Sequence, residues 1–347
     1  MIEIYFSGKM LFEFKDKNIV QIAGLNEESK RLIVDIYYKV FKGYKFSEVD
    51  MEGMNGYYPE IKKDGQIIKK DNNIVIKLTD INDIMEQLSI KSDSILLKYL
   101  LSLGGELPVS RALNKVEENL MELSIELDRL IQNKIDMDNV SIITEVSGVD
   151  LKKVIKSFVD VNFIDYKNKK KPLWLFKDKD LINLFLNYTR LILEKDNNFI
   201  IIIDGIDARI GLDVYKYFID KLYLLSEKYS NLNIWLIPKT CDGVWVNYEI
   251  FDNTYIISDK LITFEDFDIT YESICRNYPD NNLPTRFQVL EVLLKILPFH
   301  YADKTYLQTK ETVILQVFLK LQDNEPLKIK ESGLSHLETN FLTSINR

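Results

Sequence analysis

The stretch 199–205 constrains the fold of this chain more than any other. It consists of Phe-Ile-Ile-Ile-Ile-Asp-Gly. Five consecutive apolar residues, four of them β-branched, predict a strand that is buried on both faces, as strands of a parallel sheet are. Asp204 ends this strand, at the position where open α/β sheets bind their ligands. We therefore predict an α/β fold with a parallel sheet.

Composition excludes several classes of protein. A length of 347 residues allows two or three domains, and 46% hydrophobic residues are ordinary for a globular protein. Two cysteines and two histidines argue against a disulfide framework, a zinc site or a Ser-His-Asp triad. The apolar runs are far shorter than the ~20 residues of a membrane span. Glu3 places a charge near the start of the sequence, which argues against a signal peptide there. We expect a cytoplasmic protein that does not enter a membrane.

The stretch 24–31, Gly-Leu-Asn-Glu-Glu-Ser-Lys-Arg, resembles an altered phosphate loop between a strand and a helix. The intact pattern is G-x-x-x-x-G-K-[ST]. Gly24 and Lys30 are in register. Ser29 replaces the glycine that lets the backbone approach phosphate, and Arg31 replaces the hydroxyl residue that ligates Mg²⁺.

This altered loop argues against nucleotide binding. Glu27 and Glu28 add negative charge where phosphate would lie. Asp204 corresponds to the carboxylate that helps to hold Mg²⁺ in nucleotide-hydrolysing folds. Without a working loop, helix capping or hydrogen bonding within its own loop is the favoured role of Asp204. We expect no bound nucleotide, and we expect Lys30 and Arg31 to be solvated.

The stretch 81–140 is predicted to form a helical arm. A first helix over 81–103 ends at two glycines, and Pro108 opens a second helix. In that second helix the apolar residues recur in steps of four and three, as in a coiled-coil seam. They are Val109, Leu113, Val116, Leu120, Leu123, Leu127 and Leu130. We expect this seam to pack against the rest of the chain or another copy; an ordinary hairpin within an internal core is the alternative.

Lysine is concentrated in two stretches of a chain whose net charge is −8. Between 152 and 171 seven lysines face two acids, Asp160 and Asp165. The seven are Lys152, Lys153, Lys156, Lys167, Lys169, Lys170 and Lys171; the second cluster is Lys62, Lys63, Lys69 and Lys70. Lysine rather than arginine suits contact with phosphates without reading of bases. Solvated surface is the alternative for both clusters.

Further strands and helices are predicted along the chain. Strands are expected at 2–6, 10–14, 19–22, 74–78, 141–146, 161–166, 234–237 and 255–257, with an excursion of small strands in 43–73. The turn Ser7-Gly8-Lys9 predicts that the first two strands form a hairpin. Helices are expected at 150–159, 178–194, 212–229, 285–296, 311–321 and 334–345.

Together these features resemble the CRISPR-associated spacer-acquisition protein of type II-A systems, in its long subfamily. The likeness is carried by the altered loop 24–31, the arm inserted at 81–140, and the strand, helix and strand of 198–238. It implies an α/β fold in which a degenerate P-loop-NTPase-like head, 1–80 and 141–262, carries the arm 81–140. The segment 263–347 corresponds to the C-terminal helical extension of the long members.

The resemblance also implies a function. Family members form homotetrameric rings whose basic lumen encircles double-stranded DNA, with a preference for ends and without nucleotide hydrolysis. They act with the adaptation integrase and the type II effector nuclease in spacer acquisition. By position, the lysines of 152–171 are the first candidates for the lumen and those of 62–70 the second.

Calcium is the one cofactor that the resemblance suggests. Short members of the family bind Ca²⁺ through acidic residues where the arm rejoins the head. Asp136 and Asp138 occupy that junction here. A helix end followed by a turn is the alternative for this stretch.

Three hypotheses for function follow. The first is a non-enzymatic DNA clamp that reads the duplex by shape and charge. The second is a P-loop ATPase or kinase with an atypical phosphate loop. The third is a scaffold whose arm and tail recruit protein partners.

Overall fold

The computed structural model describes residues 1–68, 73–132, 143–146, 148–164, 168–195, 197–258, 261–299, 309–322, 336–337 and 340–341. The chain divides into two compact units. Unit 1 comprises Met1–Asp83 and Asp196–Arg347, and unit 2 comprises Ile84–Lys195. Both α-helices and β-sheets are present, so the fold is mixed α/β, as the sequence predicts.

All strands of the described residues belong to unit 1. They are β1 (Ile2–Phe6), β2 (Lys9–Phe14), β3 (Ile19–Ala23), β4 (Glu60–Lys63), β5 (Gln66–Ile67), β6 (Asn73–Leu78), β7 (Asn198–Asp204), β8 (Leu232–Ile237), β9 (Thr254–Ile257) and β10 (Leu261–Thr263).

The α-helices are distributed over both units. They are α1 (Glu27–Lys42), α2 (Glu48–Gly53), α3 (Ile81–Gln87), α4 (Ile95–Ser102), α5 (Leu107–Gln132), α6 (Leu151–Phe158), α7 (Asp178–Leu193), α8 (Leu212–Lys228), α9 (Phe267–Asn277), α10 (Arg286–Glu291) and α11 (Thr309–Leu321).

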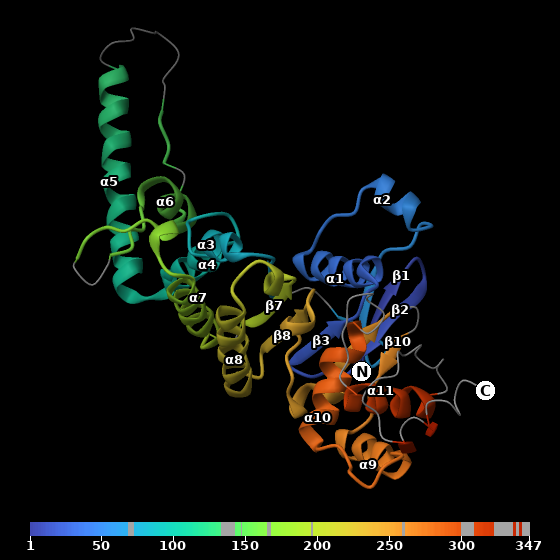
Figure 1. Ribbon diagram of the computed structural model, residues 1–347. Helices are drawn as coiled ribbons and strands as arrows, with labels where there is room; N and C mark the ends of the chain where they lie inside the picture. The colour runs from blue at the N-terminus through green and yellow to red at the C-terminus, as the bar shows by residue number, and fades with distance from the viewer. Residues whose placement is uncertain are drawn as a thin grey trace. The chain divides into compact units, whose positions relative to one another are not determined.

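A six-stranded sheet forms the centre of unit 1, in the order β10-β9-β3-β8-β7-β6 (Figure 1). The strands from β9 to β6 are parallel, and β10 is antiparallel to β9. The predicted strand 199–203 lies within β7, between β6 and β8, and its five apolar residues are all buried. The parallel sheet that this strand predicts is confirmed.

The two faces of the large sheet are covered by different elements. Side chains alternate along β7, so Ile200 and Ile202 share one face. They belong to a core cluster with residues of α1 and of the first strands. Trp235 of β8 belongs to it too, and its ring stacks on Tyr37 of α1 with centroids 3.9 Å apart. Helix α8 packs against β8. Both faces are therefore buried.

A second sheet, of order β2-β1-β4-β5, is antiparallel throughout. The turn between β1 and β2 has positive φ at Ser7 (50°) and Gly8 (74°). Two consecutive positive φ values are typical of the tight turns that match the twist of a hairpin. The hairpin predicted at Ser7-Gly8-Lys9 is confirmed.

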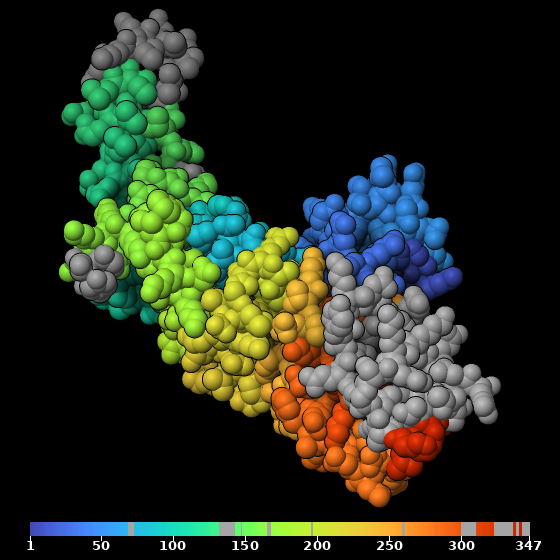
Figure 2. Space-filling view, viewed as in Figure 1, coloured from blue at the N-terminus to red at the C-terminus, as the bar shows by residue number. Residues whose placement is uncertain are grey.

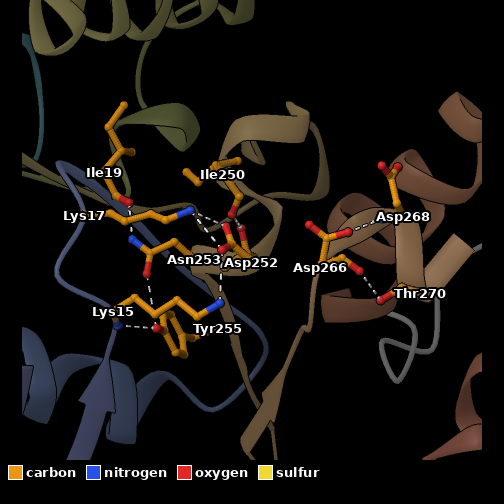
Figure 3. Close-up of polar contacts among 11 residues, drawn as sticks. Lys15, Lys17, Ile19, Ile250, Asp252, Asn253, Tyr255, Asp266, Asp268 and Thr270 are labelled. Carbon is orange, nitrogen blue, oxygen red and sulfur yellow. Dashed lines mark hydrogen bonds and ion pairs between the residues drawn. The ribbon is translucent and has the colours of Figure 1, made fainter. Parts of the chain in front are cut away.

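A polar cluster joins the end of β2 to the strand β9 (Figure 3). The ammonium groups of Lys15 and Lys17 both contact the carboxylate of Asp252, at 3.0 and 2.7 Å. Burial of this carboxylate favours a higher pKa, but the hydrogen bonds from Lys17 and Lys15 outweigh burial and lower the pKa of Asp252. The neighbouring Asn253 donates to the carbonyl oxygen of Ile19. Segments far apart in sequence are thus fixed beside each other.

The C-terminal helices of unit 1 pack on one another. Helix α11 contacts α9 and α10, and its residues 312–319 are all buried. A single π-helical turn, Val292–Ile296, continues α10. Helix α9 is capped by Asp266, whose side chain accepts hydrogen bonds from the backbone nitrogens of Asp268 and Ile269. Figure 3 shows Asp266 beside Asp268.

In unit 2 the long helix α5 exposes much of its apolar seam. Val116, Leu120, Leu123, Leu127 and Leu130 are all exposed in the single chain. The returning segment 143–146 runs beside α5 (Figure 1) and is tied to it by Thr144. The Thr144 backbone nitrogen donates to Asp128 Oδ1 (2.7 Å), and Ser124 Oγ donates to the Thr144 carbonyl oxygen (2.6 Å).

Several predicted elements are wrong. The helix expected over 81–103 is two helices, α3 and α4, because Ser94 caps a new helix after Asp93 takes a positive φ of 68°. The excursion 43–73 contains the small strands expected, β4 and β5, but also a helix, α2, whose capping box joins Ser47 and Asp50. Residues 143–146 hydrogen-bond to a helix instead of forming a strand. Much of 334–345 lies outside the described residues.

No helix among the described residues is both long and apolar enough to cross a membrane.

We predict that Gly24→Ala destabilises the protein by about 3 kcal/mol, because Gly24 combines two constraints. Its φ of +114° disfavours side chains, and an added Cβ would lie 2.8 Å from the carbonyl carbon of Ile257. Gly56→Ala is the control, since Gly56 also has a positive φ (+79°) but open space around it. Denaturation in urea should show a loss of about 1 kcal/mol for the control. Equal losses would contradict the close approach of the backbone at Gly24.

Candidate nucleic-acid interface

Helix α6 presents three lysines on one side. Asp150 caps its start by accepting a hydrogen bond from the Lys152 backbone nitrogen (2.9 Å). Ile155 is buried, which orients the helix, and Lys152, Lys153 and Lys156 are consequently exposed. Neither Lys152 nor Lys153 forms an ion pair with any residue that the structure describes. Their charge is not neutralised within that part of the chain.

A second run of lysines follows in the same unit. Lys170 bridges to Ile164, and the Lys171 backbone nitrogen donates to the Phe163 carbonyl oxygen (2.8 Å). These contacts fold the chain back on itself. Lys169 and Lys170 are exposed, while the Lys171 ammonium lies 4.5 Å from the centre of the Phe176 ring. Lys167 lies outside the described residues.

A groove of about 540 Å³ brings lysines from both runs together. Its walls are residues 88–90, 156, 159–163 and 170–173, and we call it the lysine groove. Lys156, Lys170 and Lys171 line it, with Asp160 as the acid among them. The Lys156 ammonium donates to Ser92 Oγ (2.6 Å), which is a neutral partner. Figure 2 shows the yellow-green surface of unit 2 around α6 and the segment that follows it.

The lysines of the second predicted cluster are held by acids of their own unit. Lys62 on β4 lies 3.3 Å from Glu60 Oε2 and 4.2 Å from the centre of the Tyr5 ring. Lys63 pairs with Asp16, and that hydrogen bond and charge raise the pKa of Lys63. Lys69 and Lys70 lie outside the described residues.

The altered phosphate loop is closed by its own polar groups. Gly24 follows β3, and Asn26 caps α1 by accepting a hydrogen bond from the Ser29 backbone nitrogen (3.0 Å). The Asn26 side chain also donates to the Ser258 carbonyl oxygen (3.3 Å), which ties the loop to the segment after β9. One backbone donor that an anion would need at this helix start is thus already satisfied.

The prediction that Lys30 is solvated is wrong, whereas Arg31 is solvated. Arg31 is 82% exposed, but Lys30 is only 1% exposed. The Lys30 ammonium lies 2.5 Å from Glu27 Oε1, and its buried nitrogen has no well-directed hydrogen bond. Glu27 therefore acts as the charge partner of Lys30, so the loop's two opposite charges compensate each other.

Asp204 ends β7 opposite a lysine of the neighbouring strand. The Lys77 ammonium lies 3.0 Å from Asp204 Oδ2 and 3.1 Å from Asp35 Oδ1 of α1. Burial favours a lower pKa for Lys77, but the hydrogen bonds and charges of Asp204 and Asp35 outweigh burial and raise it. Sequence reasoning missed Lys77, although a lone lysine in the apolar strand β6 is itself a signal that needs a partner.

The predicted calcium residues, Asp136 and Asp138, lie outside the described residues. Within the described ranges, no three His, Cys, Asp or Glu side chains gather as they would around a metal ion.

Comparison with known proteins places the chain next to one family. The family model described as CRISPR-associated protein Csn2 subfamily St matches residues 6–329. The crystal structure of Stu0660 of Streptococcus thermophilus aligns with a TM-score of 0.83 at 22% sequence identity, covering 100% of this chain and 99% of that one. At this identity the likeness concerns the fold. No curated protein matches.

We predict that Lys77→Met destabilises unit 1 by about 2 kcal/mol at pH 7, because it removes the cation beside the half-buried Asp204 and leaves Asp35 with only the exposed Arg31. The folded-state pKa of Lys77 is raised, so its contribution is complete below the unfolded value of about 10.4 and is lost as pH rises through the folded pKa. Urea denaturation between pH 7 and pH 11 should therefore show the two proteins converging at high pH.

The matched control for this prediction is Lys91→Met. Lys91 pairs with Glu86 at 2.7 Å, but both side chains are 58% exposed. An exposed pair contributes about 0–1 kcal/mol. Equal losses from the two variants, or a difference that does not depend on pH, would contradict the role given to Lys77.

Proposed function

The chain belongs to the Csn2 family of CRISPR-associated proteins, subfamily St, and on this basis we propose that it is a non-enzymatic DNA clamp that acts in spacer acquisition. It binds double-stranded DNA through phosphates, without regard to sequence and preferentially at ends. Its work on DNA takes place in the cytoplasm.

The observation that carries this proposal is the difference between the two groups of lysines. Lys152, Lys153 and Lys170 have no carboxylate partner among the described residues, whereas Lys62 and Lys63 are each paired with one. A polyanion gains most from charges that are not already neutralised. The lysines of unit 2 are therefore the first candidates for contact with DNA, and Lys62 and Lys63 contribute less.

The proposal includes a degenerate P-loop-NTPase-like head that hydrolyses no nucleotide. Two contacts support this part. The Asp204 carboxylate, which would help to hold Mg²⁺ in an active site, pairs with the Lys77 ammonium. The Lys30 ammonium, which would contact phosphates, pairs with Glu27. A P-loop ATPase or kinase remains the alternative that nucleotide binding in equilibrium dialysis would favour.

The apolar seam of α5 is the surface on which we base a proposal for assembly. The seam is exposed along much of the helix in the single chain, and an exposed apolar surface of this kind marks a site of protein–protein contact. We propose that it packs against other copies in a homotetrameric ring. A basic lumen inside an acidic exterior would reconcile DNA binding with a net charge of −8. The adaptation integrase and the type II effector nuclease are the partners that the family membership suggests, and Asp136 with Asp138 remains the proposed calcium site.

A charge-neutralising triple variant tests the clamp. We expect Lys152→Gln/Lys153→Gln/Lys156→Gln to weaken binding to duplexes of all sequences alike, because the lysines contact phosphates. The slope of log affinity against log salt should flatten by about one for each phosphate that is left without a lysine. Titration of labelled linear DNA at several salt concentrations measures both quantities.

The control is Lys9→Gln/Lys45→Gln/Lys216→Gln, which removes the same charge from exposed lysines of unit 1. Its affinity should change much less. If the two triple variants bind alike, net charge and not the face of α6 determines affinity. If the α6 variant binds DNA normally, the scaffold hypothesis is favoured.

A further inference from the structure

Two aromatic side chains stand in solvent beside the lysine groove. Phe158 is 84% exposed and Trp174 is 71% exposed. Each adjoins a residue of the groove wall in sequence, Val159 and Leu173 respectively. Together with the exposed Ile164, these side chains add apolar surface to a region that is rich in lysine. Phosphate contact alone does not explain the rings.

The groove has the size of a small-ligand site. Its volume of about 540 Å³ falls in the range of ~300–1,000 Å³ that is typical of such pockets. It therefore admits a nucleotide or two but not a duplex. Its walls carry hydrogen-bonding groups, including Ser89 and Asn162, besides the three lysines.

One ring of the wall is held in place by its neighbours. Phe163 lines the groove and meets Phe176 edge to face, with centroids 6.2 Å apart. The Lys171 ammonium lies over the other ring, that of Phe176. The aromatic and cationic groups of this region are thus arranged together before any ligand binds.

Cationic grooves fringed by aromatic rings are typical of sites for single-stranded nucleic acid, where phosphates meet lysines and bases stack on rings. We propose that the lysine groove binds the unpaired nucleotides at a DNA end, with phosphates on Lys156, Lys170 and Lys171 and bases stacked on Trp174 and Phe158. This inference rests on the proposed DNA clamp and adds a binding site for the end itself. It gives a physical reason for a preference for ends with an overhang, since duplex interiors and blunt ends offer no unpaired base.

The fluorescence of Trp174 makes the proposal testable. Stacking of a base on an exposed tryptophan should quench its emission, whereas Trp235 is 1% exposed and beyond the reach of a ligand. The probes are two duplexes of equal length, one blunt and one with an overhang of five thymidines. The full-length protein should bind the overhang duplex about tenfold more tightly, given the gain of ~1–3 kcal/mol per stacked base. Only that duplex should quench strongly.

The variant Trp174→Leu keeps an apolar side chain but removes the stacking ring. It should abolish both the quenching and the preference for the overhang while leaving blunt-duplex affinity unchanged. Trp245 of unit 1, which is half-buried against Tyr223, provides the matched control, and Trp245→Phe should retain both. Phe158→Ser, at a second exposed position, should reduce the preference independently, so the test does not depend on one variant folding well.

Other outcomes would overturn the inference. Equal affinity for the two duplexes, or a preference that survives Trp174→Leu, would contradict it while leaving the clamp intact. Quenching by inorganic polyphosphate or poly-L-glutamate as strong as that by the overhang would assign the groove to anions without bases, such as an acidic protein. If neither duplex binds, the proposed DNA clamp fails and the inference fails with it.

Discussion

The burial of β7 between β6 and β8 is the constraint on which unit 1 depends. Its five consecutive apolar residues bury side chains on both faces of the sheet. The parallel strands on either side provide hydrogen-bond partners for its backbone. Where this apolar run ends, Asp204 lies half-buried at the carboxyl end of β7. A half-buried carboxylate requires a cation, and Lys77 from the adjacent strand provides it. The carboxylate that would help to hold Mg²⁺ in an active enzyme is thus paired with a lysine of the same sheet.

Charge is distributed unevenly in this chain, and that distribution matters more than its net value. In unit 1 several lysines lie beside carboxylates: Lys15 and Lys17 at Asp252, Lys63 at Asp16, Lys77 at Asp204. In unit 2, Lys152 and Lys153 have no such partner among the residues that the structure describes. Pairing stabilises the fold in the first case, while unpaired charge in the second is available to a polyanion.

Local signals allowed most of the regular elements to be predicted. The runs of β7 and β8, the hairpin at Ser7-Gly8, and the long helix α5 all follow from hydrophobic period and turn residues. The predictions failed where a cap or a contact distant in sequence decided the outcome. Ser94 caps a new helix after the polar stretch 91–94, Lys-Ser-Asp-Ser, where a search for apolar period alone continues the first helix. Ser47 and Asp50 close a capping box in a glycine-rich stretch that has few helical signals.

The candidate site was predictable in composition but not in arrangement. The excess of lysine between 152 and 171 is visible in the sequence, whereas the groove that joins Lys156 to Lys170 depends on the chain folding back at Ile164. The burial of Lys30 does not follow from the residues around it in sequence. Glu27 adds negative charge where phosphate would lie, and only the folded loop shows that Glu27 pairs with Lys30. Hydrophobic period and amino-acid composition do not specify which charged side chains come into contact in the fold.

Binding to linear and covalently closed circular DNA of equal sequence is the most direct test of our proposal that this protein encircles DNA. Gel-shift titrations across a range of salt concentrations would compare the two forms. We expect linear DNA to bind and the closed circle not to bind, because a ring must thread onto an end, and we expect affinity to fall steeply with salt. Equal binding of the two forms would contradict it, since the lysines would then act as an open surface.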